Sequence, residues 1–109
     1  GPLIKKGEKY FNYVNKEVPA DQVVEYKDKF KGHQYYHKYT EAQIQNLKEL
    51  LIFLFTTYKI PLHYNEDMWT VSKNATSGKA GLYTHVSYRP DKSDAHPDPS
   101  LIKMLKSLN

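Results

Sequence analysis

The stretch Thr40-Glu-Ala-Gln-Ile-Gln-Asn-Leu-Lys-Glu-Leu-Leu-Ile-Phe-Leu-Phe-Thr-Thr-Tyr58 decides the fold expected for this chain. It opens with a capping box, because the Thr40 hydroxyl can accept the backbone N–H of Gln43 while the Gln43 side chain reaches back. Apolar residues then recur at three- and four-residue spacing, which predicts a helix with one apolar stripe. The stripe consists of Ile44, Leu47, Leu51, Leu54 and Tyr58.

The sequence also predicts how far this helix is buried and where it ends. Leu50, Phe53 and Phe55 widen the stripe and predict burial on more than one side. Ile60-Pro61 ends the helix, since the residue before a proline is pushed out of the helical region.

Two elements are expected downstream. Residues 81–88, Gly-Leu-Tyr-Thr-His-Val-Ser-Tyr, are rich in β-formers and predict a strand that carries His85 on one face. We expect the Thr40–Tyr58 helix to pack against this strand. A short helix should follow, with Asp98 as its N-cap and Pro99 at its first position.

Residues 1–39 are polar and tyrosine-rich, and are predicted to be mostly irregular. Short strand candidates lie at residues 10–14 and 22–26, and residues 30–32 predict a turn. Together the elements predict an α/β fold, a mixed β-sheet flanked by helices, in a single domain over residues 1–109.

The composition narrows the class of protein. The 109 residues are 39% hydrophobic and 26% charged, which is typical of a small globular domain. A net charge of +4 favours an anionic partner, and the absence of cysteine excludes disulfides and thiolate zinc ligands. No apolar run is long enough to span a membrane, so no membrane span is expected.

Imidazole, carboxylate and ammonium groups gather near the C-terminus, at His85, Lys92, Asp94 and His96. Nitrogen and oxygen ligands suit a catalytic zinc, which needs three protein ligands and an open position. A lysine nearby could stabilise developing negative charge. The alternative from spacing alone is a hydrogen-bonded structural histidine beside an ordinary solvated loop.

Several motifs of the segment from Thr40 to Leu108 resemble, in order, the C-terminal part of the zinc-dependent N-acetylmuramoyl-L-alanine amidases, which include phage lysins and peptidoglycan recognition proteins. The motifs are the helix start Tyr39-Thr40-Glu-Ala-Gln43, the exit Tyr58-Lys-Ile-Pro61, the strand Gly81-Leu-Tyr-Thr-His85 and the loop Lys92-Ser-Asp94-Ala95. The resemblance implies that His85 and Asp94 bind zinc and that Lys92 stabilises the tetrahedral intermediate.

The chain departs from this family at several points. Ala95 stands where the family usually has proline. His96 could compete as a ligand, although we interpret it as a residue that supports a ligand or faces the substrate. Nothing in residues 1–39 resembles the family's first zinc-histidine strand, so an N-terminal segment or a partner chain is expected to complete the site. The remaining candidates for a third ligand are His33 and His37, because their spacing would place both on one face of a helix. We favour the alternative that they are surface histidines in an aromatic loop. His63 is expected to be structural.

The sequence therefore predicts a bacterial or phage peptidoglycan amidase, such as an endolysin, that uses Zn²⁺ and acts at the cell wall. A non-catalytic peptidoglycan-binding or structural module on the same fold is the alternative. A basic nucleic-acid-binding domain is a more distant one, and we expect no nucleic-acid partner. The tyrosines of residues 10–39, with their interleaved lysines, could stack on sugars or bases, or form the edge of a core.

Overall fold

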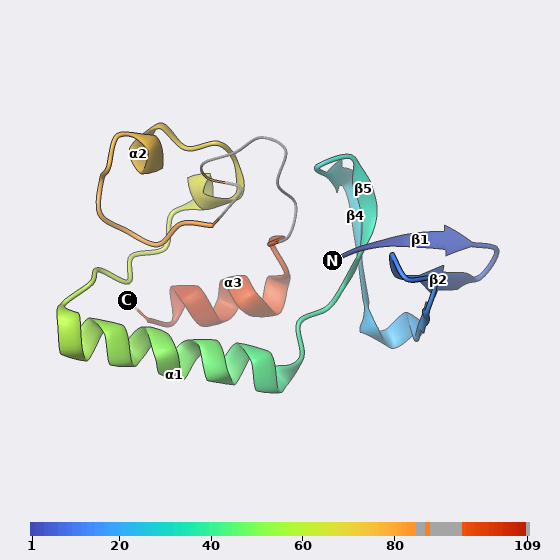
Figure 1. The fold of residues 1–109 in the computed structure, drawn as a ribbon, viewed down its shortest axis with the longest axis horizontal. Coiled ribbons are helices and arrows are strands. Elements are labelled where there is room, and N and C mark those ends of the chain that lie inside the picture. The colour runs from blue at the N-terminus through green and yellow to red at the C-terminus, as the bar shows by residue number, and fades with distance from the viewer. Residues whose placement is uncertain (85–86, 88–94, 109) are drawn as a thin grey trace.

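The computed structural model of the chain describes residues 1–84, 87 and 95–108. Strands fill the N-terminal part and helices the C-terminal part, and Figure 1 shows the helices gathered at one end of the sheet. The strands are β1 (Pro2–Lys6), β2 (Lys9–Phe11), β3 (Glu17–Val18), β4 (Val23–Phe30) and β5 (His33–His37). The helices are α1 (Glu41–Tyr58), α2 (Lys73–Thr76) and α3 (Pro99–Lys106), with 3₁₀ turns η1 at Ala20–Gln22 and η2 at Glu66–Trp69.

The five strands form one sheet in the order β3-β2-β1-β5-β4, and each neighbouring pair is antiparallel. The predicted combination of a β-sheet with helices is confirmed. The β4–β5 hairpin turns at Lys31 and Gly32, whose φ angles of 52° and 80° suit a two-residue turn with positive φ at both central positions. This turn confirms the one predicted at residues 30–32.

The prediction that residues 1–39 are mostly irregular is wrong, because this segment holds every strand of the sheet. Its strands are short, and pairs of rings from different strands, such as Tyr10 and Tyr35 with centroids 5.1 Å apart, pack against one another. Such cross-strand contacts join residues far apart in sequence and leave no clear alternation to read.

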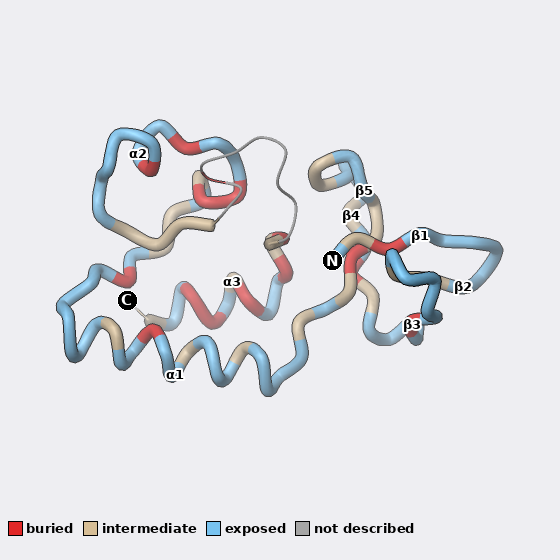
Figure 2. The backbone as a smooth tube through the Cα atoms, viewed as in Figure 1, coloured by how far each residue is buried: buried red, intermediate tan, exposed pale blue. Residues whose placement is uncertain are grey.

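Helix α1 begins and ends where the sequence predicts. The Gln43 N–H donates to the Thr40 hydroxyl at 3.0 Å, and the Thr40 N–H donates to the Gln43 side chain at 2.8 Å. Lys59 ends the helix in the left-handed conformation, with a φ of 59°. Leu51 is the buried residue of α1, whereas Leu50 and Phe53 are exposed, as Figure 2 shows for most of the helix. The expected burial on more than one side is therefore wrong.

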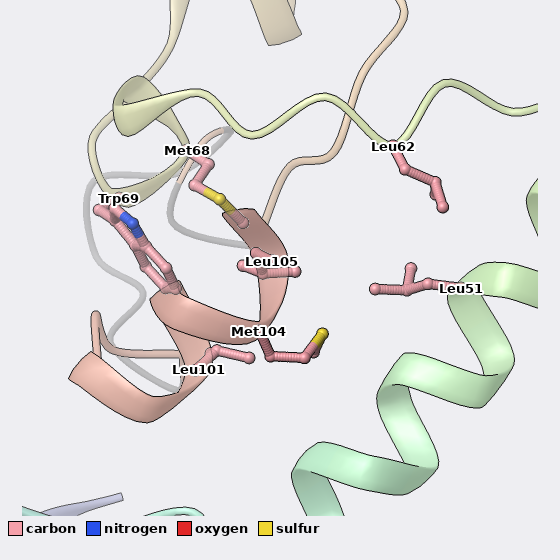
Figure 3. Packing of buried hydrophobic residues seen from close by; sticks show 7 residues of the cluster. All are labelled: Leu51, Leu62, Met68, Trp69, Leu101, Met104 and Leu105. Carbon is pink, nitrogen blue, oxygen red and sulfur yellow. The ribbon is translucent and has the colours of Figure 1, made fainter. Parts of the chain in front are cut away.

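The hydrophobic core lies between α1, α3 and the segment that connects them (Figure 3). Asp98 caps α3 by accepting the Ser100 N–H at 2.8 Å, and Pro99 occupies its first turn, as predicted. The buried members of the core are Leu51, Leu62, Met68, Trp69, Leu101, Met104 and Leu105.

Helix α1 packs against α3. In the described part of residues 81–88, residues 82–84 have no regular structure and the Ser87 N–H donates to the Thr84 carbonyl at 3.0 Å, as in a tight turn. The predicted strand is therefore wrong for these residues. His85 itself lies outside the described residues.

No helix within the described ranges is long and apolar enough to cross a membrane.

Candidate functional site

The three residues expected to carry the chemistry, His85, Lys92 and Asp94, lie outside the described residues. Elsewhere, among the residues that the structure places, no group of three or more His, Cys, Asp or Glu side chains is close enough to hold a metal ion. What the structure shows is how the chain is held at Thr84 and Ser87, and again from His96 onward.

The N-terminal side is held by two hydroxyls on one carbonyl. Ser87 donates from its Oγ to the backbone oxygen of Met68 at 2.7 Å, and Thr84 donates from its Oγ1 to the same oxygen at 2.8 Å. The Thr84 N–H in turn donates to Ser87 Oγ at 3.0 Å, and the Ser72 N–H donates to the Ser87 carbonyl at 2.8 Å. Ser87 is fully buried, so both neighbours of the His85–Val86 pair are attached to the core at η2.

The C-terminal side is held by His96, whose side chain is fully buried. Its Nε2 lies 3.0 Å from the carbonyl oxygen of His37, and its Nδ1 lies 2.7 Å from the Tyr26 hydroxyl. A carbonyl can only accept, so the Nε2 of His96 donates to the His37 carbonyl. Burial favours the neutral imidazole, in which Nδ1 accepts from the Tyr26 hydroxyl, and both ring nitrogens are hydrogen-bonded.

Two tyrosines sandwich the same imidazole. The ring of Tyr36 stacks on His96 with centroids 4.6 Å apart, and the ring of Tyr39 stacks with centroids 4.7 Å apart. The Tyr39 hydroxyl also accepts a hydrogen bond from the backbone N–H of His96 at 3.2 Å. We call this group of Tyr26, Tyr36, Tyr39 and His96 the histidine clasp; it joins the start of α3 to the sheet.

The interpretation of His96 as a substrate-facing residue is therefore wrong. Its side chain has no exposed surface, and neither ring nitrogen is free to bind a metal in this arrangement. His96 instead holds the position of the chain two residues after Asp94.

Asp98 adds a second attachment at this point. Its Oδ2 accepts the Tyr39 N–H at 3.1 Å while its Oδ1 caps α3. One buried carboxylate thus connects Tyr39, which precedes the N-cap of α1, to the first turn of α3.

Burial in the clasp shifts the pKa values of two groups. Desolvation lowers the pKa of His96, although its hydrogen bond to the His37 carbonyl opposes this. Burial also raises the pKa of the Tyr26 hydroxyl, and the nearby Asp98 carboxylate adds to the effect. Both shifts favour the neutral form of the group.

This shift predicts that acid destabilises the protein. Because the unfolded imidazole takes up its proton near pH 6.5 and the folded one only at lower pH, the contribution of His96 is fully present above about pH 6.5 and is lost as the pH falls. The free energy of unfolding should drop by up to about 1.4 kcal/mol per pH unit in that window. Urea denaturation at a series of pH values measures it.

His96→Asn should flatten this part of the pH profile, whereas His63→Gln, which removes an exposed histidine, should keep it. Equal slopes for the parent and His96→Asn would contradict the assignment of a neutral, buried imidazole.

An apolar pocket of about 220 Å³ lies between α1 and α3. Thr84 and Ala95 both line it, so the residues on either side of segment 85–94 lie at the wall of the same pocket. Core side chains form most of the other walls, including Leu51, Trp69 and Leu105.

The remaining histidines do not form a metal pair. His33 and His37 lie on strand β5, four residues apart, which corresponds to roughly 13 Å along a strand. The His37 Nε2 lies 3.1 Å from the Gln22 side chain, and the His33 ring packs edge-on against Tyr36. The helical pairing is thus excluded, and the aromatic loop in which we placed these histidines is a strand.

No family model, curated protein or solved structure matches the chain.

Sequence reasoning missed the histidine clasp and the two hydroxyls on Met68. The only signal for the clasp was the run Ala95-His-Pro-Asp-Pro99, whose prolines indicate a rigid entry to α3. Nothing local indicates that its partners are tyrosines of β4, of β5 and of the segment before α1.

Proposed function

We propose that the chain forms the part of a peptidoglycan amidase domain that supplies two zinc ligands and an oxyanion-stabilising lysine. The reaction would hydrolyse the amide between N-acetylmuramic acid and L-alanine. Support comes from the motif of His85, Lys92 and Asp94, together with one structural observation. Thr84 and Ala95, which bracket that motif, both line a single pocket, and the Thr84 hydroxyl is hydrogen-bonded to the Met68 carbonyl.

The two proposed ligands, His85 and Asp94, are side chains of types that bind zinc. An imidazole from His85 and a carboxylate from Asp94 are ligands of the kind found in catalytic zinc sites, where three protein groups leave a fourth position open. When bound, zinc would polarise the scissile carbonyl and lower the pKa of the attacking water. The third ligand and the acid/base group would come from an N-terminal segment or a partner chain.

The protein's own residues would have distinct tasks. Lys92 would place its ammonium beside the carbonyl oxygen as negative charge develops there. The histidine clasp would hold the chain after Asp94 in place, so that the ligand is not positioned by a loose loop. With these tasks the protein would act at the bacterial cell wall, as an envelope or phage-delivered protein.

A non-catalytic peptidoglycan-binding or structural module is the second candidate. The two candidates differ in whether zinc and Lys92 matter.

Zinc binding tests the proposal directly. The chain should bind one Zn²⁺ weakly, and His85→Ala or Asp94→Ala should each lower the affinity by more than about tenfold, since even outer-shell partners of zinc ligands cost 10–100-fold. Isothermal titration at neutral pH measures the effect.

His33→Ala and His37→Ala are the matched controls and should bind zinc as the parent does. Zinc binding that survives both His85→Ala and Asp94→Ala, or that disappears in a control, would place the metal elsewhere. Stoichiometric zinc retained through dialysis against a chelator would contradict the incomplete ligand set.

A further inference from the structure

The apolar pocket between α1 and α3 reaches from the protein surface into the core. On α1 it is lined by Gln43 and Leu47, which are exposed, whereas Met68 and Leu105, which also line it, are buried. Figure 3 shows Leu51 of α1 and Leu105 of α3, both lining residues, pointing toward one another. A ligand that enters from solvent would therefore contact core side chains.

The volume of the pocket limits the size of the ligand that it can hold. The pocket measures about 220 Å³. An apolar cavity of ~150 Å³ engineered into another protein binds benzene. In proportion, this pocket has room for roughly nine non-hydrogen atoms where that cavity holds the six of benzene. Such a ligand has the size of two small fused rings or of one substituted ring.

The pocket wall selects against charge. Among the lining residues that the structure describes, none carries an ionisable acid or a basic group, and most are aliphatic or aromatic. An ionised ligand would lose its hydration on entering such a pocket and gain no opposite charge in return. The ligand that fits this wall is therefore uncharged.

Two polar side chains of the wall already have hydrogen-bond partners within the protein. The Gln43 side-chain oxygen accepts the Thr40 N–H at 2.8 Å in the capping box. The Thr84 hydroxyl donates to the Met68 carbonyl at 2.8 Å. A ligand would have to break these hydrogen bonds to use the same groups, so apolar contact is the main source of its affinity.

The kinds of side chain in the wall favour an aromatic ligand over an alkyl chain. Three aromatic side chains, those of Tyr39, Trp69 and Tyr83, line the pocket together with the thioether of Met68. Aromatic rings attract one another in offset or edge-on arrangements beyond what their buried area provides. Methionine sulfur also packs favourably against rings. An alkyl chain of the same size would gain neither contribution.

We infer that the pocket between α1 and α3 is a binding site for a small, neutral aromatic compound of about the size of indole. Its dissociation constant should be roughly 0.01–1 mM, the range for a ligand of about nine atoms that is held mainly by apolar contact. The inference does not rest on the amidase proposal, because its argument uses neither zinc nor the residues His85, Lys92 and Asp94.

Titration of the whole, metal-free chain with indole tests the inference. Trp69 lines the pocket and is the only tryptophan of the sequence, so its side-chain N–H gives a single, assignable NMR signal. This signal should shift and saturate as indole is added. Indole-2-carboxylate has the same rings with an ionised carboxylate, and should bind at least about tenfold more weakly.

Two variants place extra side-chain volume in the pocket. Ala95→Leu enlarges a lining residue and should weaken indole binding by more than about tenfold, since a filled pocket leaves too little space. Ala80→Leu, the same change at an exposed residue outside the lining, is its matched control and should bind like the parent. Leu47→Phe changes an exposed lining residue, so it tests the pocket with less risk to the core.

Leu50→Phe is the matched control for Leu47→Phe, because Leu50 is exposed on the same helix and does not line the pocket. Leu47→Phe should weaken binding several fold and Leu50→Phe should not. Circular dichroism shows whether each variant is folded. The inference is overturned if indole leaves the Trp69 signal of the parent unchanged or if indole-2-carboxylate binds as tightly as indole. It is also overturned if the folded pocket variants bind like the parent.

Discussion

Replacing Lys92 with alanine is expected to lower the turnover of a zinc-loaded amidase, assembled with the N-terminal part of the domain, by ~10²–10³-fold. That is the scale of one contact to a developing oxyanion. The effect should fall on kcat and leave substrate binding nearly unchanged, because the ammonium would act mainly on charge that appears in the transition state. Release of new amino groups from purified peptidoglycan measures it.

Lys92→Arg is the informative companion variant. It keeps the charge but should restore only part of the activity, since a planar guanidinium cannot occupy the position of a compact ammonium. Lys103→Gln on α3 should leave turnover unchanged. Full activity of Lys92→Ala would show that the role assigned to this lysine is wrong.

Replacing Trp69 with alanine is expected to lower the free energy of unfolding by about 3–5 kcal/mol, the range for removing a buried aromatic side chain. Trp69 is 7% exposed in the core between α1 and α3, and its indole N–H donates to the Tyr64 hydroxyl at 3.1 Å. Such a loss is a large fraction of the 5–15 kcal/mol typical of a domain. Urea denaturation followed by circular dichroism measures it without the indole as reporter.

Phe53→Ala is the matched control, because it also removes an aromatic ring but from a side chain that is 56% exposed on α1. Its effect should stay within about 0.5 kcal/mol. A loss at Phe53 as large as that at Trp69 would mean that α1 is buried on its outer side, as its sequence alone suggests.

The helices were predictable because their signals are local. The Thr40–Gln43 capping box and the Asp98-Pro99 start each act within four residues, and both occur where expected. The extent of burial was not predictable, since apolar spacing cannot tell which side of a helix meets a partner. Leu51 meets α3, whereas Phe53 meets solvent.

The sheet could not be predicted from the sequence, and the reason is physical. Its strands are held by pairings such as Leu3 with Tyr35, which join residues far apart in the chain. Tyrosines such as Tyr35 and Tyr36 also pack against rings from other parts of the chain. At residues 82–84 a strand was expected but is not formed. The β-forming side chains there lie in an irregular segment, in which the Thr84 hydroxyl is hydrogen-bonded to the Met68 carbonyl. Tertiary hydrogen bonding overrides propensity in this place.

The candidate site was predictable only as a set of residue types. His85, Lys92 and Asp94 follow from a motif, and they stay a prediction because they lie outside the described residues. The surroundings of the motif depend on long-range contacts. Tyr26 and His96 are separated by 70 positions yet share a hydrogen bond of 2.7 Å, a contact that no local pattern reveals.

The chemical identity of the bond that is cut tests the central claim most directly. Purified peptidoglycan is treated with the zinc-loaded assembly, and the soluble products are analysed by mass spectrometry. The proposal predicts stem peptides that begin with a free L-alanine amino group, intact glycan strands, and no such products from His85→Ala. Cleaved glycan strands with the lactyl–alanine amide intact, or cell walls that are bound without any product, would contradict it.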